Sequence, residues 1–95
     1  MEKQTRAEIL KADGTRTAVE PRNGKTFELV QLQEIVGGLI EIIHLQDGRL
    51  MILNEEGKLK RLALNRIATA LARGTILAYD HICGDVLVCE ERQLD

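Results

Sequence analysis

Two Asp-Gly pairs, Asp13-Gly14 and Asp47-Gly48, constrain the fold of this chain more than any other feature. Each pair lies between two short aliphatic runs, residues 7–11 and 16–20 in the first case and 39–45 and 49–53 in the second. Asp-Gly favours the positive φ angles of tight hairpin turns, so each pair predicts a β-hairpin. A further turn signal at residues 54–57 predicts a third strand of the second unit over residues 58–62.

Two other stretches have the period of a helix. Apolar residues recur at three- and four-residue spacing between Thr26, the expected N-cap, and Gly37, the expected C-terminal stop. Asn65 is the expected N-cap of a second helix over residues 66–73. After it, residues 75–79 and 86–89 are expected to be strands, and residues 90–95 a polar tail of about one helical turn.

These elements follow the order ββαβββαββ and predict an α+β fold. We expect an antiparallel sheet built from β-hairpins, with two short helices packed on one face. The 95 residues suffice for a single domain over 1–95, in which residues 1–6 and 90–95 are polar ends. Helices on one face leave strand edges and the other face open, which favours dimerisation by edge pairing or by an exposed aliphatic patch.

Composition excludes several classes of protein. Hydrophobic residues make up 44% of the chain and the net charge is −2, which argues against disorder. One Phe, one Tyr and no Trp argue against base-stacking sites and aromatic cages, and the absence of serine excludes a serine nucleophile. The N-terminal MEKQTR has no apolar run, and no run approaches the roughly 20 residues that span a bilayer. A cytoplasmic protein with reduced thiols is therefore expected.

Residues 58–73, here called the basic segment, have an unusual charge. The segment contains no acid, whereas the rest of the chain has 8 basic and 15 acidic residues. Its cations are candidates for nucleic-acid contact: Lys58, Lys60, Arg61, Arg66 and Arg73. The alternative is a solvated surface paired with the acids of the C-terminal segment, Asp80, Asp85, Glu90, Glu91 and Asp95. The pI of about 5.7 and the lack of stacking aromatics favour this alternative.

His81, Cys83 and Cys89 are the candidate metal ligands, with His44 or Asp85 as a fourth. Structural zinc sites carry closely spaced ligand pairs at two places in the chain, and only one such pair exists here. The pattern therefore favours a loop histidine and two semi-buried thiols, and we expect no cofactor. It leaves open whether the two cysteines pair. A Cys–His nucleophile has no neighbouring signal for an oxyanion hole.

The order of these motifs resembles a known family. The stretches ILKADGTRTAVEPRNGKTF, VGGLIEII, LQDGRLMILNEEGKLKRLALNRIATAL and GDVLV together resemble the domain-of-unknown-function family numbered 3846. The resemblance implies a small protein of bacteria, phages or mobile elements, and it transfers no activity, ligand or site residue.

The leading functional hypothesis is a non-enzymatic interaction module. It would act as an accessory protein of a phage or mobile element by binding a protein partner or itself. The alternative is nucleic-acid contact through the basic segment, without a membrane role in either case.

Overall fold

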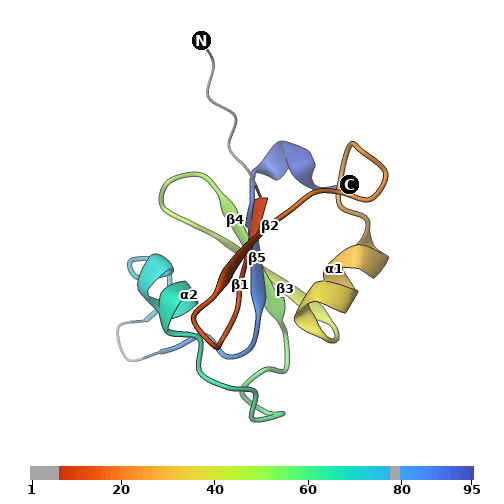
Figure 1. Ribbon diagram of the computed structural model, residues 1–95. Helices are drawn as coiled ribbons and strands as arrows, with labels where there is room; N and C mark the ends of the chain where they lie inside the picture. The colour runs from red at the N-terminus through yellow and green to blue at the C-terminus, as the bar shows by residue number, and fades with distance from the viewer. Residues whose placement is uncertain (1–6, 78–79) are drawn as a thin grey trace.

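The computed structural model describes residues 7–77 and 80–95. Five strands form one antiparallel sheet in the order β2-β1-β5-β4-β3 (Figure 1). Their bounds are β1 Ala7–Leu10, β2 Arg16–Val19, β3 Ile40–His44, β4 Leu50–Asn54 and β5 Val86–Cys89. The helices are α1 Leu29–Val36, α2 Arg66–Leu71 and the 3-10 helix η1 Glu91–Gln93. The predicted α+β class and both Asp-Gly hairpins are confirmed.

The prediction that both helices pack on one face is wrong, because α1 and α2 lie on opposite faces of the sheet (Figure 1). The α1-side core consists of Ala7, Phe27, Leu32, Val36, Leu50, Ile52, Leu87 and Cys89. The α2-side core consists of Leu10, Leu45, Met51, Leu53, Ala68, Ala72, Ile82, Val86 and Val88. Alternate residues of β4 and β5 thus enter different cores. A strand buried on both faces has a continuous apolar run, which both of these strands show.

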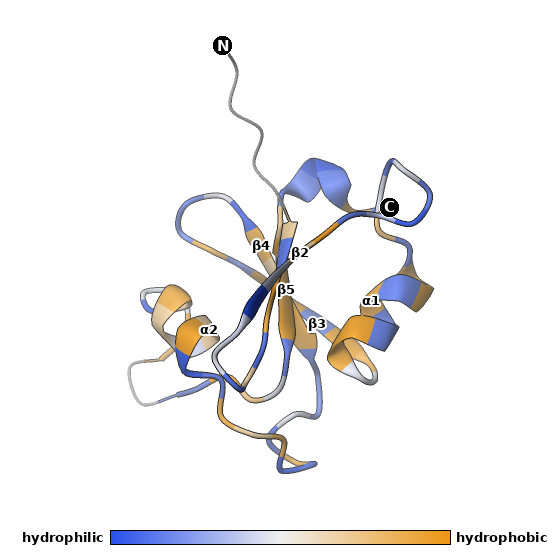
Figure 2. Ribbon diagram, viewed as in Figure 1, coloured by the Kyte–Doolittle hydropathy of each residue, from blue (hydrophilic) through white to orange (hydrophobic). Residues whose placement is uncertain are grey.

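Helix α1 ends as predicted and begins two residues later than predicted. Glu28, rather than Thr26, is its N-cap residue. Gly37 ends the helix with a φ of 81° and donates its N–H to the carbonyl of Gln33. Glycine adopts this left-handed conformation without steric strain. Figure 2 shows a largely hydrophobic β4 and a hydrophilic turn between β3 and β4, whereas β2 contains a strongly hydrophilic part.

The predicted strand over residues 58–62 is a helical turn instead. The N–H of Lys60 bonds to the carbonyl of Glu56, and Leu62 N–H bonds back to Gly57. A Cβ on Gly57 would lie 2.9 Å from the carbonyl oxygen of Cys83, so this turn packs directly against the segment before β5. The Asn-Glu-Glu-Gly signal therefore starts a compact loop and adds no strand.

The predicted strand over residues 75–79 is also not observed in its described part. Residues 73–76 form a turn closed by a bridge between Arg73 and Ile76, and residues 78–79 lie outside the described part of the chain. Helix α2 begins at Arg66 after its predicted N-cap, Asn65, but ends at Leu71. The sheet consequently has five strands, and β5 is its central strand although it comes last in the chain.

The C-terminal residues form the expected single turn, η1, and then pair with a distant segment. Leu94 forms a parallel bridge with Phe27, whose N–H bonds to the carbonyl of Gln93 at 2.7 Å. Leu94 packs against the α1-side core. The tail is polar in composition, yet it covers the fully buried ring of Phe27.

Candidate binding groove

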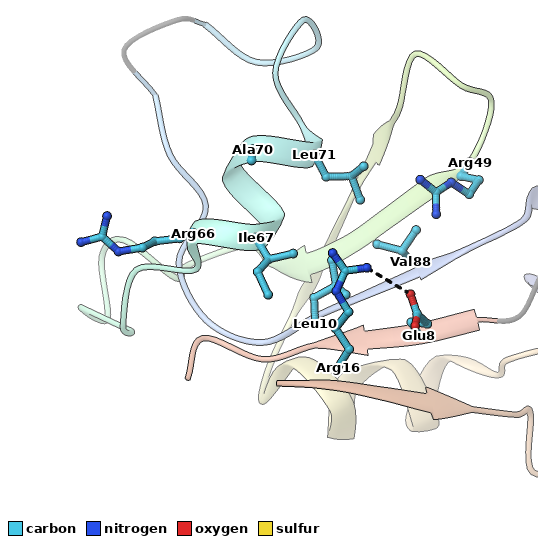
Figure 3. Close-up of a pocket in the computed structure, with 9 residues that line it drawn as sticks. All are labelled: Glu8, Leu10, Arg16, Arg49, Arg66, Ile67, Ala70, Leu71 and Val88. Atoms are coloured by element: carbon cyan, nitrogen blue, oxygen red, sulfur yellow. Dashed lines mark ion pairs between the residues drawn. The ribbon is translucent and has the colours of Figure 1, made fainter. Parts of the chain in front are cut away.

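The α2-bearing face of the sheet carries a groove, here called the α2 groove (Figure 3). It measures about 570 Å³. Its lining consists of Glu8, Leu10, Arg16, Arg49, Arg66, Ile67, Ala70, Leu71 and Val88. These residues come from β1, β2, β5, α2 and the turn before β4, so five separate parts of the chain build it.

The shortness of α2 explains the groove. Its six residues span only about 9 Å at the usual rise of an α-helix, less than the width of the sheet that it covers. Ala68 and Ala72 are fully buried in the α2-side core. Ile67 and Leu71 pack against the same core but remain partly exposed, and with Leu10 and Val88 they form an apolar floor.

Three arginines and one glutamate also line the groove, and in Figure 3 the Arg66 side chain points away from the floor. The Arg49 guanidinium already has an ion-pair partner, because its Nε and a terminal nitrogen contact Asp47 Oδ2 at 2.9 and 2.8 Å. These contacts hold the pKa of Asp47 below its usual value. Arg16 lies 3.8 Å from Glu8, too far for a hydrogen bond. The Arg66 side chain has no hydrogen-bond or ion-pair partner among the described residues.

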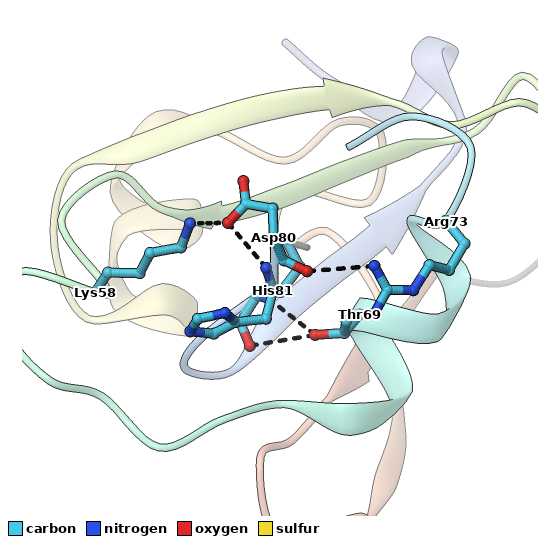
Figure 4. A network of polar contacts seen from close by, with 6 residues as sticks. Lys58, Thr69, Arg73, Asp80 and His81 are labelled. Carbon is cyan, nitrogen blue, oxygen red and sulfur yellow. Dashed lines mark hydrogen bonds and ion pairs between the residues drawn. The ribbon is translucent and has the colours of Figure 1, made fainter. Parts of the chain in front are cut away.

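A polar network ties the segment before β5 to α2 (Figure 4). The hydroxyl of Thr69 accepts a hydrogen bond of 2.8 Å from the N–H of Ile82, and Arg73 donates to the carbonyl of Asp80 at 3.3 Å. Lys58 forms an ion pair with Asp80. The hydrogen bond from Lys58, followed by that from the His81 N–H, lowers the pKa of the Asp80 carboxyl. The network supports the loop next to the groove.

Comparison with known proteins confirms the family that the sequence motifs resemble. A family model described as Domain of unknown function (DUF3846) matches residues 7–94. The chain belongs to this family. No curated protein and no solved structure matches the chain. Among the described residues of this DUF3846 domain, no helix is long and apolar enough to cross a membrane.

The cations of the basic segment lie at several separate places in the DUF3846 domain. Lys58 pairs with Asp80, and Lys60 lies 3.3 Å from Glu56. Arg66 lines the groove with its side chain pointing outward from α2, and Arg73 donates to the carbonyl of Asp80. Arg61 is exposed on the turn before α2. The basic segment therefore does not form one continuous surface of unpaired cations.

Of the acidic C-terminal residues, Asp80 contacts the basic segment through Lys58 and Arg73. Asp85 instead accepts a hydrogen bond from the N–H of Ala12 at 2.9 Å. Glu90 pairs with Arg92 and closes the capping box of η1. Part of the predicted pairing is thus present, at Lys58.

The candidate metal ligands lie in different parts of the described structure. Among the described residues, no group of three or more His, Cys, Asp or Glu side chains could hold a metal ion. His81 is exposed, Cys83 is buried before β5, and Cys89 ends β5 in the α1-side core. Both cysteines are free thiols. Burial, with a smaller contribution from Glu90, raises the pKa of Cys89 to about 11.

Two groove residues, Arg16 and Arg49, did not stand out in the sequence. Each follows an Asp-Gly turn, where the sequence predicts an ordinary hairpin residue. Strand alternation places Arg16 on the same face as Leu10, its partner in β1. Their presence in the same lining as Arg66 depends on the strand order and on the face that α2 covers, and no local sequence pattern contains that information.

Proposed function

We propose that this DUF3846 domain is a small non-enzymatic interaction module that binds a segment of a protein partner in the α2 groove. The observation that carries the proposal is the groove itself, an apolar floor left open beside a six-residue helix. Its lining contains no His, Cys or Lys, and its one carboxylate lies beside Arg16. This composition suits binding better than acid–base or nucleophilic catalysis.

The family resemblance supports a biological setting for this module. We place it as an accessory protein of a phage or mobile element that acts in the cytoplasm. The genes that neighbour members of the family provide the check: a setting in core metabolic operons would contradict the assignment.

A site-specific crosslinking experiment tests the groove. We would replace Ala70, exposed on α2 and part of the lining, with a photoreactive phenylalanine in the full chain. Ala63, exposed but outside the lining, is the matched control. After irradiation in host cells, we expect protein adducts at position 70 and few at position 63. Equal labelling at both positions, or labelling at neither, would overturn the proposal.

Nucleic-acid contact is the second candidate function. It is favoured by Arg61 and Arg66, whose guanidinium groups are exposed and have no partner among the described residues. The ion pairs of Lys58 and Lys60 weaken it, as does the complete burial of Phe27, which removes the one Phe from any stacking role. This candidate requires binding that weakens steeply with salt and disappears in a Lys60→Glu/Arg61→Glu variant. Absence of DNA and RNA binding at low salt would eliminate it.

A further inference from the structure

The charge around the α2 groove points to the chemistry of its ligand. We infer that the groove accepts an acidic peptide segment in which an aliphatic side chain is flanked by carboxylates. The inference rests on the proposed function and adds the class of partner. The lining has three arginines against one glutamate, so the groove attracts an anion.

Two of the three arginines have no short hydrogen bond to a carboxylate in the described structure. Arg49 already binds Asp47 through two nitrogens. Arg16 makes only the long contact of 3.8 Å with Glu8, and its side chain is 59% exposed. Arg66 has no partner in the described structure. A guanidinium group binds a carboxylate through two parallel hydrogen bonds, so each of these two residues can receive one carboxylate.

The positions of the two arginines set the pattern of the ligand. Arg16 comes from β2 and Arg66 from the first residue of α2. In Figure 3, Arg16 extends beside Leu10, whereas the Arg66 side chain extends from α2 away from Ile67 and Leu10. The apolar floor therefore has one cationic group beside it, Arg16, and a second, Arg66, at the outer end of α2. An extended or helical peptide with an aliphatic anchor between two acids matches this arrangement.

The lining favours a peptide over a nucleic acid. Bases bound without sequence preference need aromatic rings on which to stack, and the groove lining has none. An aliphatic floor instead accepts Leu, Ile or Val side chains. Exposed ion pairs contribute about 0–1 kcal/mol each, so the acids would select the ligand while the aliphatic anchor supplies most of the affinity.

A selection from random sequences tests this inference without a known partner. A display library of random 12-residue peptides would be selected on the immobilised full chain. The test variant is Arg16→Gln/Arg66→Gln, and the control is Arg22→Gln/Arg61→Gln, which removes two exposed arginines outside the lining and changes the net charge equally. An Ala70→Trp variant, whose ring would obstruct the groove, reports on the groove itself.

We expect peptides with acids on both sides of an aliphatic residue to be enriched on the wild type and on the control. Their affinity should fall at least tenfold on the test variant and should decrease with added salt. Enrichment of neutral peptides that Ala70→Trp abolishes would overturn the acidic ligand but leave the binding groove intact. No enrichment over Ala70→Trp would overturn the proposed function as well. Displacement of the selected peptide by an equal concentration of oligo-dT would instead support nucleic-acid contact and overturn the peptide ligand.

Discussion

At the scale of single residues, Asn65 connects more of the fold than any other polar side chain described. Its Oδ1 accepts a hydrogen bond from the N–H of Ala68, and its Nδ2 donates to the carbonyls of Leu10 and Gly84, both at 2.8 Å. It thus caps α2 while bonding to the end of β1 and to the turn before β5. The residue is fully buried, so water cannot replace these bonds.

We expect Asn65→Ala to lower the free energy of unfolding by about 2–4 kcal/mol, since it removes a helix cap and leaves buried carbonyls without a donor. Urea denaturation measures the change. Asn23→Ala is the control, because the Asn23 side chain also accepts bonds from two backbone N–H groups but is exposed. Equal losses in the two variants would show that Asn65 is an ordinary cap.

Arg61 occupies a backbone conformation that glycine usually takes, with a φ of 58°. Leu62 N–H bonds to Gly57 and Arg61 N–H bonds to Lys58, which is the Schellman pattern at the end of a helical turn. We expect Arg61→Gly to stabilise the fold by about 0.5–1 kcal/mol and Arg61→Val to destabilise it, because a branched Cβ is strained there. Thermal and urea unfolding of the pair would measure this, and an opposite order would contradict it.

The Cys89 thiol should be inert in the folded protein. With a pKa of about 11, roughly one thiol in a thousand is ionised at pH 8, and the residue is buried. In a Cys83→Ala variant, we expect a disulfide reagent to label Cys89 slowly in buffer and at once in urea. The raised pKa adds to the free energy of unfolding at pH values below 9.0, the ordinary pKa of the thiol. This contribution is lost as the pH rises toward 11. Rapid labelling of the folded variant would contradict the expected burial.

At the scale of elements, strand β3 is an edge with limited room for self-association. The backbone groups of Leu39 and Leu45 bond to the residues that flank β4. Successive residues of an edge strand direct their backbone N–H and C=O groups alternately toward and away from the neighbouring strand, so those of Ile40, Ile42 and His44 point away from the sheet. The hydroxyl of Thr75 already bonds to the carbonyl of His44 at 3.3 Å. The open part of the edge is therefore Ile40 to Ile42, of which Ile42 is 41% exposed.

Two copies pairing through this open part would place Glu41 opposite its symmetry mate. Like charges directly opposite each other destabilise a strand pair, so Glu41 disfavours the pairing of two copies through β3. We expect Glu41→Gln to increase dimerisation at neutral pH, which analytical ultracentrifugation would detect. Glu55→Gln, an exposed acid just beyond β4, is the control for net charge. An unchanged sedimentation coefficient for Glu41→Gln at high concentration would argue against pairing through β3.

At the scale of the whole molecule, the C-terminal residues are joined to the segment before α1 and to the α1-side core. Phe27 bonds to Gln93 and Asp95, and Leu94 covers the same core. We expect deletion of residues 91–95 to destabilise the fold by about 2–4 kcal/mol through lost hydrogen bonds and exposed apolar surface. Glu91→Ala should have little effect. A deletion variant with an unchanged unfolding midpoint would show that the tail is dispensable.

The sequence by itself determined the local structure of this protein. The Asp-Gly hairpins, the Gly37 stop and the Asn65 cap depend on φ preferences and short-range hydrogen bonds, and a few neighbouring residues contain that information. The same kind of signal failed at residues 58–62, where a turn motif was compatible with either a strand or a helical turn after it. Close packing of Gly57 on Cys83 accompanies the helical turn.

Only the tertiary structure decided which faces and which distant residues meet. The helices lie on opposite faces of the sheet because β4 and β5 present apolar side chains on both faces. Each apolar face must be shielded from water by a packed element. The insertion of β5 between β1 and β4 then brings Arg16, Arg49 and Arg66 around one groove. Burial of apolar surface is not directional and acts over the whole chain, so the groove arises from the assembly of the elements.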